Sequence, residues 1–190
     1  MKPARRSATV LALLLLAAGQ EPVAKLKLIS LVHNDVSASE ATAPASIARY
    51  DLPRNRLIFN QHEIHIAIQA GFDFEDQIFL INGLLNPDIQ VPRGATLAIT
   101  LAAMRSPASF VIAPRPPAAG EVSTVDARPR DPAPIRPDFG DRIAFAPPRR
   151  LSSPTIEIVT VTYLAEKAGT LYWSNGKWPE GCYGRIIVVP

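Results

Sequence analysis

The C-terminal stretch GTLYWSNGKWPEGCYGRIIVVP, residues 169–190, decides the fold class of this chain. Two runs of β-branched and aromatic residues flank a turn-forming centre. Asn175-Gly176 is among the strongest two-residue hairpin signals, because both residues tolerate positive φ at little cost. The stretch therefore predicts a terminal β-hairpin with WSNGKW at its tip, where Trp173 and Trp178 would form a cross-strand pair.

Strand patterns also precede this hairpin. In residues 63–69, isoleucines alternate with polar or small side chains, which is the period of a strand with one buried face. Similar signals predict strands at 25–32, as an edge strand, and at 56–71, 95–102, 109–113 and 155–163. No segment after residue 19 carries a convincing helical stripe, and turn signals separate the strands. We therefore predict an all-β fold, a Greek-key β-sandwich or barrel.

The first nineteen residues have the features of an export signal. Lys2, Arg5 and Arg6 precede an apolar run over residues 8–18, and small residues follow at 17–19. The run is too short for a membrane-spanning helix, which needs about 20 apolar residues. We predict a signal peptide at 1–19, a periplasmic or extracellular mature protein, and no transmembrane segment after its removal.

The rest of the chain is predicted to form one domain with two irregular parts. Residues 20–55 are interpreted as an N-terminal strand followed by a surface excursion, and residues 56–190 as the main domain. Within that domain, residues 113–154 are rich in proline and poor in apolar pattern, so they are predicted to be a long insertion.

Charge and cysteine content exclude some functions. The predicted signal carries three of the 20 basic residues and none of the 17 acidic ones, so 17 of each remain. A balanced chain without a basic face does not indicate a nucleic-acid-binding protein. Cys182 is the only cysteine, which rules out an intrachain disulfide.

From about Arg56 to Pro190 the order of motifs resembles the cupredoxins, most closely the sulfocyanin and rusticyanin type. The likeness is carried by FLINGLLNPDIQVPRGATLAITL, SPASFVIAP, LAEKAGTLYW and GCYGRIIVVP. The resemblance implies a cupredoxin-like Greek-key β-sandwich. In that family, two histidines, a cysteine and a weak axial methionine form a type 1 copper site used in electron transfer.

The resemblance also identifies the residues at the ligand positions, and the ligand types are missing there. Ala108 stands at the first histidine position and Lys177 at the second. The cysteine position falls on Asn175 or on Tyr172, depending on the end from which the loop is counted. Cys182 stands at the methionine position. We therefore predict a degenerate site without a copper cofactor.

An atypical copper site is the alternative, built from Cys182, His62, His65 and Met104. Positions three apart on a regular strand face opposite sides, so His62 and His65 would not converge without an irregularity between them. The thiol of Cys182 has three interpretations: an inert buried group, a thiolate ligand, or half of an intermolecular disulfide.

No catalytic constellation is recognisable, so an enzyme is not predicted. The leading hypothesis is an exported, non-catalytic structural or interaction protein, accessory to another envelope protein or to a respiratory electron-transfer complex. The alternative is a copper-binding electron-transfer or copper-carrier protein. Trp173 and Trp178 either pack within the domain or serve as candidate partner contacts, since tryptophan is enriched in interface hot spots.

Overall fold

The computed structural model describes residues 22–37, 45–70, 78–103, 109–119, 136–139, 142–145, 155–176 and 179–190. The predicted signal peptide, Met104, Ala108, Lys177 and Trp178 lie outside these ranges. No helix in the described part is long and apolar enough to cross a membrane.

Fourteen strands and a single 3-10 turn make up the regular structure of the described residues. The strands are β1 (Lys25–Ser37), β2 (Arg49–Asp51), β3 (Arg56–Ile58), β4 (Glu63–Ala70), β5 (Phe79–Ile81), β6 (Leu84–Leu85), β7 (Asp88–Pro92), β8 (Thr96–Ala103), β9 (Phe110–Ala113), β10 (Arg136–Phe139), β11 (Arg142–Phe145), β12 (Thr155–Lys167), β13 (Gly169–Asn175) and β14 (Tyr183–Val189). The 3-10 turn, Leu52–Arg54, joins β2 to β3.

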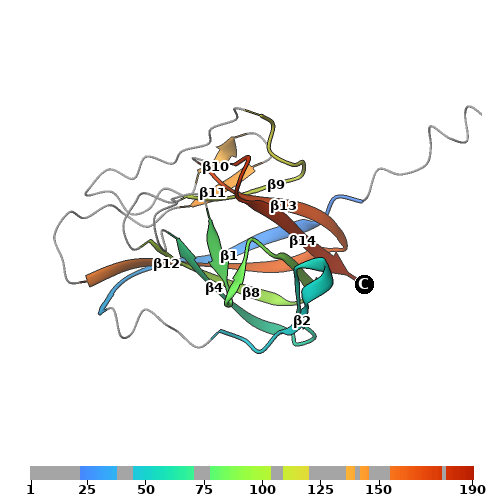
Figure 1. Ribbon diagram of the computed structural model, residues 1–190, viewed down its shortest axis with the longest axis horizontal. Coiled ribbons are helices and arrows are strands. Elements are labelled where there is room, and N and C mark those ends of the chain that lie inside the picture. The colour runs from blue at the N-terminus through green and yellow to red at the C-terminus, as the bar shows by residue number, and fades with distance from the viewer. Residues whose placement is uncertain are drawn as a thin grey trace, which may run out of the picture.

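The strands form two sheets that lie one over the other (Figure 1). The six-stranded sheet has the order β1-β12-β8-β4-β5-β6, and the eight-stranded sheet has the order β10-β11-β9-β13-β14-β7-β3-β2. Most neighbours are antiparallel, whereas β4 with β8, β14 with β7 and β3 with β7 are parallel. The prediction of an all-β sandwich is confirmed.

One hydrophobic core fills the space between the sheets. Along β4, Ile64, Ile66 and Ile68 are buried while the residues between them are half-buried, so the predicted alternation is confirmed. The eight-stranded sheet contributes the Trp173 indole, which stacks on the Phe110 ring with centroids 5.6 Å apart. Both rings are fully buried, which gives this core a large aromatic area removed from water.

The predicted two-residue turn at Asn175-Gly176 is wrong. Asn175 is still part of β13, and its backbone N–H donates to the carbonyl of Cys182 at 2.8 Å. The N–H of Gly176 donates instead to the carbonyl of Ser109 at 2.9 Å. The segment before β9 therefore takes the hydrogen bond that a tight hairpin would need, and a longer loop connects β13 to β14.

The irregular parts of the chain contain strands that the sequence analysis missed. β2 and the 3-10 turn fall within the predicted excursion, and β2 pairs with β3. β10 and β11 fall within the proline-rich insertion, and β11 extends the eight-stranded sheet by pairing with β9. In the six-stranded sheet, the edge strand β1 pairs with β12 and continues five residues past the predicted end, to Ser37.

The hydroxyl group of Tyr163 on β12 lies in the core without a hydrogen-bond partner among the described residues. Tyr163 is fully buried. A buried polar group without a partner costs about 1–3 kcal/mol. We expect Tyr163→Phe to raise the free energy of unfolding by about 1 kcal/mol, measured by urea denaturation.

Tyr50→Phe is the matched control, because the Tyr50 hydroxyl donates to the carbonyl of Asn82 at 3.0 Å. Its loss should lower the free energy of unfolding by about 0.5–1.5 kcal/mol. Equal destabilisation by both substitutions would contradict the assignment of an unpaired hydroxyl at Tyr163.

Candidate functional site

The end of the molecule that holds the predicted degenerate site is organised by Asn86. Its backbone is left-handed, with φ of 43°, a conformation that asparagine tolerates better than most residues. The side-chain oxygen accepts hydrogen bonds from the backbone N–H of Phe79 at 2.9 Å and from the thiol of Cys182 at 3.2 Å. The side-chain amide donates to the carbonyl of Gly181 at 3.2 Å. One side chain thus joins the start of β5 to the loop before β14.

Cys182 is a fully buried thiol within the hydrophobic core cluster. Burial raises the pKa of Cys182 to about 12, an effect that outweighs the backbone hydrogen bonds from Phe79 and Asn175, which lower it. The thiol is therefore protonated at neutral pH. Of its three interpretations, the structure favours the inert buried group, since a metal ligand or nucleophile needs the thiolate.

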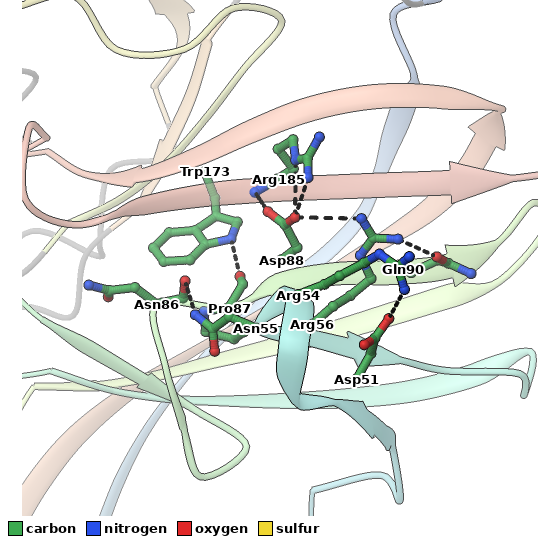
Figure 2. A network of polar contacts seen from close by, with 10 residues as sticks. All are labelled: Asp51, Arg54, Asn55, Arg56, Asn86, Pro87, Asp88, Gln90, Trp173 and Arg185. Atoms are coloured by element: carbon green, nitrogen blue, oxygen red, sulfur yellow. Dashed lines mark hydrogen bonds and ion pairs between the residues drawn. The ribbon is translucent and has the colours of Figure 1, made fainter.

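Trp173 lies beside this thiol loop and is anchored to the same turn. Its indole N–H donates to the carbonyl of Pro87 at 3.1 Å (Figure 2). Gly184 provides the space, because a Cβ there would lie 2.7 Å from both the indole ring and the carbonyl of Pro87. Trp173 is fully buried. Of its two interpretations, the burial of Trp173 favours packing within the domain over a partner contact.

A row of charges continues from the same turn across the outer face of the eight-stranded sheet. The Asp88 carboxylate accepts two hydrogen bonds from the Arg185 guanidinium, at 2.6 and 3.0 Å, and one from the Arg185 backbone N–H at 2.9 Å. Arg56 approaches the same carboxylate at 3.8 Å and donates to Gln90 at 3.2 Å. Figure 2 shows Asp88 between the two arginines. The pairing fastens β3, β7 and β14 together.

Sequence reasoning missed Asp88 and Arg185 because neither belongs to a recognisable motif. The only available signal was a single charged residue in each of two largely apolar strands, at the first position of β7 and the third position of β14.

Solved structures similar to this chain are rusticyanins. Reduced rusticyanin is 17% identical over 83% of this chain and 100% of its own length, with a TM-score of 0.60. Rusticyanin variants give 17% identity over 83% of this chain and 97% of theirs, with a TM-score of 0.62. Rusticyanin from Thiobacillus ferrooxidans gives 17% identity over 85% and 99%, with a TM-score of 0.57.

The chain has the cupredoxin fold. No protein-family model matches the sequence, and no curated protein matches it significantly. At 17% identity, the structural likeness establishes the fold alone. Function is therefore inferred from the residues of the candidate site.

Within the cupredoxin fold, the two candidate cysteine positions differ in environment. Tyr172 is half-buried on the face of β13 that points away from the core, opposite Arg185 and Ala113 on the neighbouring strands. Asn175 is buried, next to Phe110 of β9 in register. Neither residue supplies a thiolate or an imidazole.

The two candidate histidines lie apart from the Cys182 thiol. His62 is exposed in a bend before β4. His65 is on the face of β4 opposite the core, where its Nε2 is 2.7 Å from the hydroxyl of Thr100. Thr100 in turn lies 2.8 Å from the hydroxyl of Thr160. The structure therefore places His65 on the outside of the six-stranded sheet and Cys182 in the core.

The described residues do not fit a type 1 copper ion. Such a site combines a thiolate with two imidazoles, whereas the groups that hydrogen-bond to Cys182 are the Asn86 amide and the backbone of Phe79 and Asn175. Among the residues that the structure describes, no three histidine, cysteine or acidic side chains come together as a metal-binding group. The Asn86 oxygen, which could otherwise face a ligand, already accepts two hydrogen bonds.

Substitutions at Asn86 test its organising role. Asn86→Gly keeps the left-handed backbone accessible and removes three hydrogen bonds, so the free energy of unfolding should fall by roughly 1–3 kcal/mol. Asn86→Ala should lower the free energy of unfolding by about 1–2 kcal/mol more, which is the cost of a left-handed residue that carries a Cβ. Asn86→Asp retains the acceptor oxygen, so it should lower the free energy of unfolding less than either of the other two substitutions. Urea denaturation measures all three, and a glycine variant as stable as the wild type would contradict the role.

The reactivity of Cys182 tests its burial. With a pKa of about 12, only about one thiol in ten thousand is ionised at pH 8, so iodoacetamide should modify the native protein far more slowly than the urea-unfolded protein. Tyr183→Cys in a Cys182→Ser background is the control, because position 183 is 48% exposed and should react at once. Equal rates for the native protein and this control would show that the thiol is accessible.

The same pKa predicts a stability change in alkali. The folded value lies above the ordinary value of 9.0, so the unfolded thiol loses its proton first. The stabilising contribution of the neutral thiol is complete below pH about 9 and decreases as the pH rises towards about 12. Wild type should therefore lose more stability than Cys182→Ala over this interval, as measured by urea denaturation at each pH.

Proposed function

We propose that this protein is an exported cupredoxin-fold protein without a blue-copper site, and that it acts as a non-catalytic structural or interaction protein of the cell envelope. The proposal rests on one observation. The side chain at the position that the resemblance assigns to the axial ligand is a neutral buried thiol that donates a hydrogen bond to the side-chain oxygen of Asn86, so this thiol links two segments of the fold.

The aromatic packing of the core cluster that contains the thiol supports the same proposal. Phe79, Phe110 and Trp173 form a continuous aromatic group, with ring centroids 5.6 to 5.9 Å apart. The indole N–H is satisfied by Pro87. Apolar packing and neutral hydrogen bonds between the described residues stabilise this end of the domain, which supports a fold organised by its own side chains.

The accessory role is proposed because the sheets of the domain offer surfaces to another protein. A β-sandwich without a metal site cannot exchange electrons through copper, but it presents rigid sheet faces and edges on which another protein can dock. The resemblance to rusticyanin-type proteins makes a respiratory electron-transfer complex of the envelope the first partner to test.

Copper titration tests the metal-free part of the proposal. The purified mature chain, titrated with Cu(II), should develop no intense visible thiolate-to-copper absorption, and any weak binding should be unchanged in Cys182→Ser. Tight binding of one copper per chain that is lost in Cys182→Ser would favour the copper-carrier alternative. Elemental analysis of the protein isolated from its own host is the matching measurement in the cell.

A second experiment tests the accessory role. A tagged chain, mildly crosslinked in its own host and isolated from the envelope, should carry subunits of a respiratory complex in fixed proportion. Recovery of the crosslinked chain without such subunits would contradict the proposed partner while leaving the copper result untouched.

A further inference from the structure

The two sheets of the sandwich have four edges, and one of them differs from the rest. Three edges end in short strands: β6 with two residues, β2 with three and β10 with four. The fourth edge is β1, which has 13 residues. Short edge strands are a common protection against pairing with other chains, whereas a long edge presents a row of backbone donors and acceptors.

The outer edge of β1 is unoccupied by the rest of the described fold. All of its strand pairing is with β12, from Lys25 to Ser37. No other backbone hydrogen bond involves a residue of β1 among the described residues. Alternate peptide groups of an antiparallel edge strand point away from its neighbour, so this edge carries backbone groups that can pair with a further strand.

The side chains of β1 are unusually apolar for an exposed edge. Leu28, Ile29 and Val32 are 42%, 55% and 46% exposed. Ile29 sits at an irregularity in the register between Leu28 and Ser30, where β1 contains an extra residue relative to β12. Burial of these three side chains against a partner would add a hydrophobic contribution to the backbone pairing.

The distribution of charge along β1 favours a second copy of this chain as the partner. Lys25 and Lys27 lie at the beginning of the strand, where Lys25 also pairs with Glu166 of β12 at 2.8 Å, and Asp35 lies near the end of the strand. Antiparallel pairing of two β1 strands places the basic end of each copy beside the acidic end of the other, with the apolar middles facing. A parallel arrangement would bring like charges together, which is unfavourable.

We propose that two copies of this protein associate through antiparallel pairing of their β1 edges. The pairing joins the six-stranded sheets of the two copies into one continuous sheet about a twofold axis. Such an isologous contact closes on itself, so it gives a dimer and removes the long edge from further pairing. This inference does not depend on the proposed function, because β1 belongs to the sheet that does not carry Cys182.

Sedimentation equilibrium of the purified mature chain over a range of concentrations tests the proposal. The wild type should be a dimer, and Ile29→Lys and Val32→Lys should each weaken association by about tenfold or more, because an unpaired charge is placed at the contact. Leu52→Lys is the matched control. Leu52 is 68% exposed on the 3-10 turn beside the opposite sheet, so this variant should dimerise like the wild type.

The three substituted side chains are exposed, so thermal melts should show that each variant remains folded. A monomeric wild type at every concentration would overturn the proposal. Dissociation by Leu52→Lys, or unchanged dimers with both β1 variants, would assign association to another surface and overturn it as well.

A chemical test examines the strand contact directly. Ser30 is exposed near the middle of β1, and Cys182 is buried, so Ser30→Cys introduces a single accessible thiol. Mild oxidation should link two copies through this residue, and the link should not form in the Ser30→Cys, Val32→Lys double variant. Equal crosslinking of the single and double variants would reflect random collision and contradict the pairing.

Discussion

The turn between β6 and β7 is the constraint on which the rest of the structure depends. Asn86 holds the start of β5 and the loop before β14, and the carbonyl of Pro87 holds the Trp173 indole. Asp88 holds Arg185 at the start of β14. These three consecutive residues connect both sheets at one end of the sandwich. Their polar groups have partners within the chain, which is what allows this end to be buried.

This arrangement shows how the described residues at this end of the cupredoxin fold pack around a thiol. A buried polar group costs free energy unless it is hydrogen-bonded, and a buried charge costs more. Here Cys182 is neutral and donates a hydrogen bond to Asn86, and Trp173 is fully buried in the same core cluster. Gly184 is required beside it, because any larger residue would collide with the indole. The thiol therefore belongs to a packed, hydrogen-bonded end of the core.

The parts of the fold that local pattern determines were predictable from the sequence. The alternation of β4 was confirmed because burial of one face imposes a period of two on neighbouring residues. The Asn175-Gly176 turn was wrong because the competing hydrogen bond comes from Ser109, far away in the chain. The contacts of the site could not be predicted for the same reason. Trp173 donates a hydrogen bond to Pro87, 86 positions away, and Arg185 pairs with Asp88, 97 positions away.

The same distinction between local and long-range information applies to the β1 edge. An edge strand is recognisable from its own sequence, yet its freedom to pair depends on whether any other segment covers it. In the described fold, β1 is bonded on one side to β12 and carries exposed Leu28, Ile29 and Val32. A monomer would leave both this apolar row and the adjacent peptide groups in water. Association of two edges removes the apolar row from water and pairs the peptide groups at once.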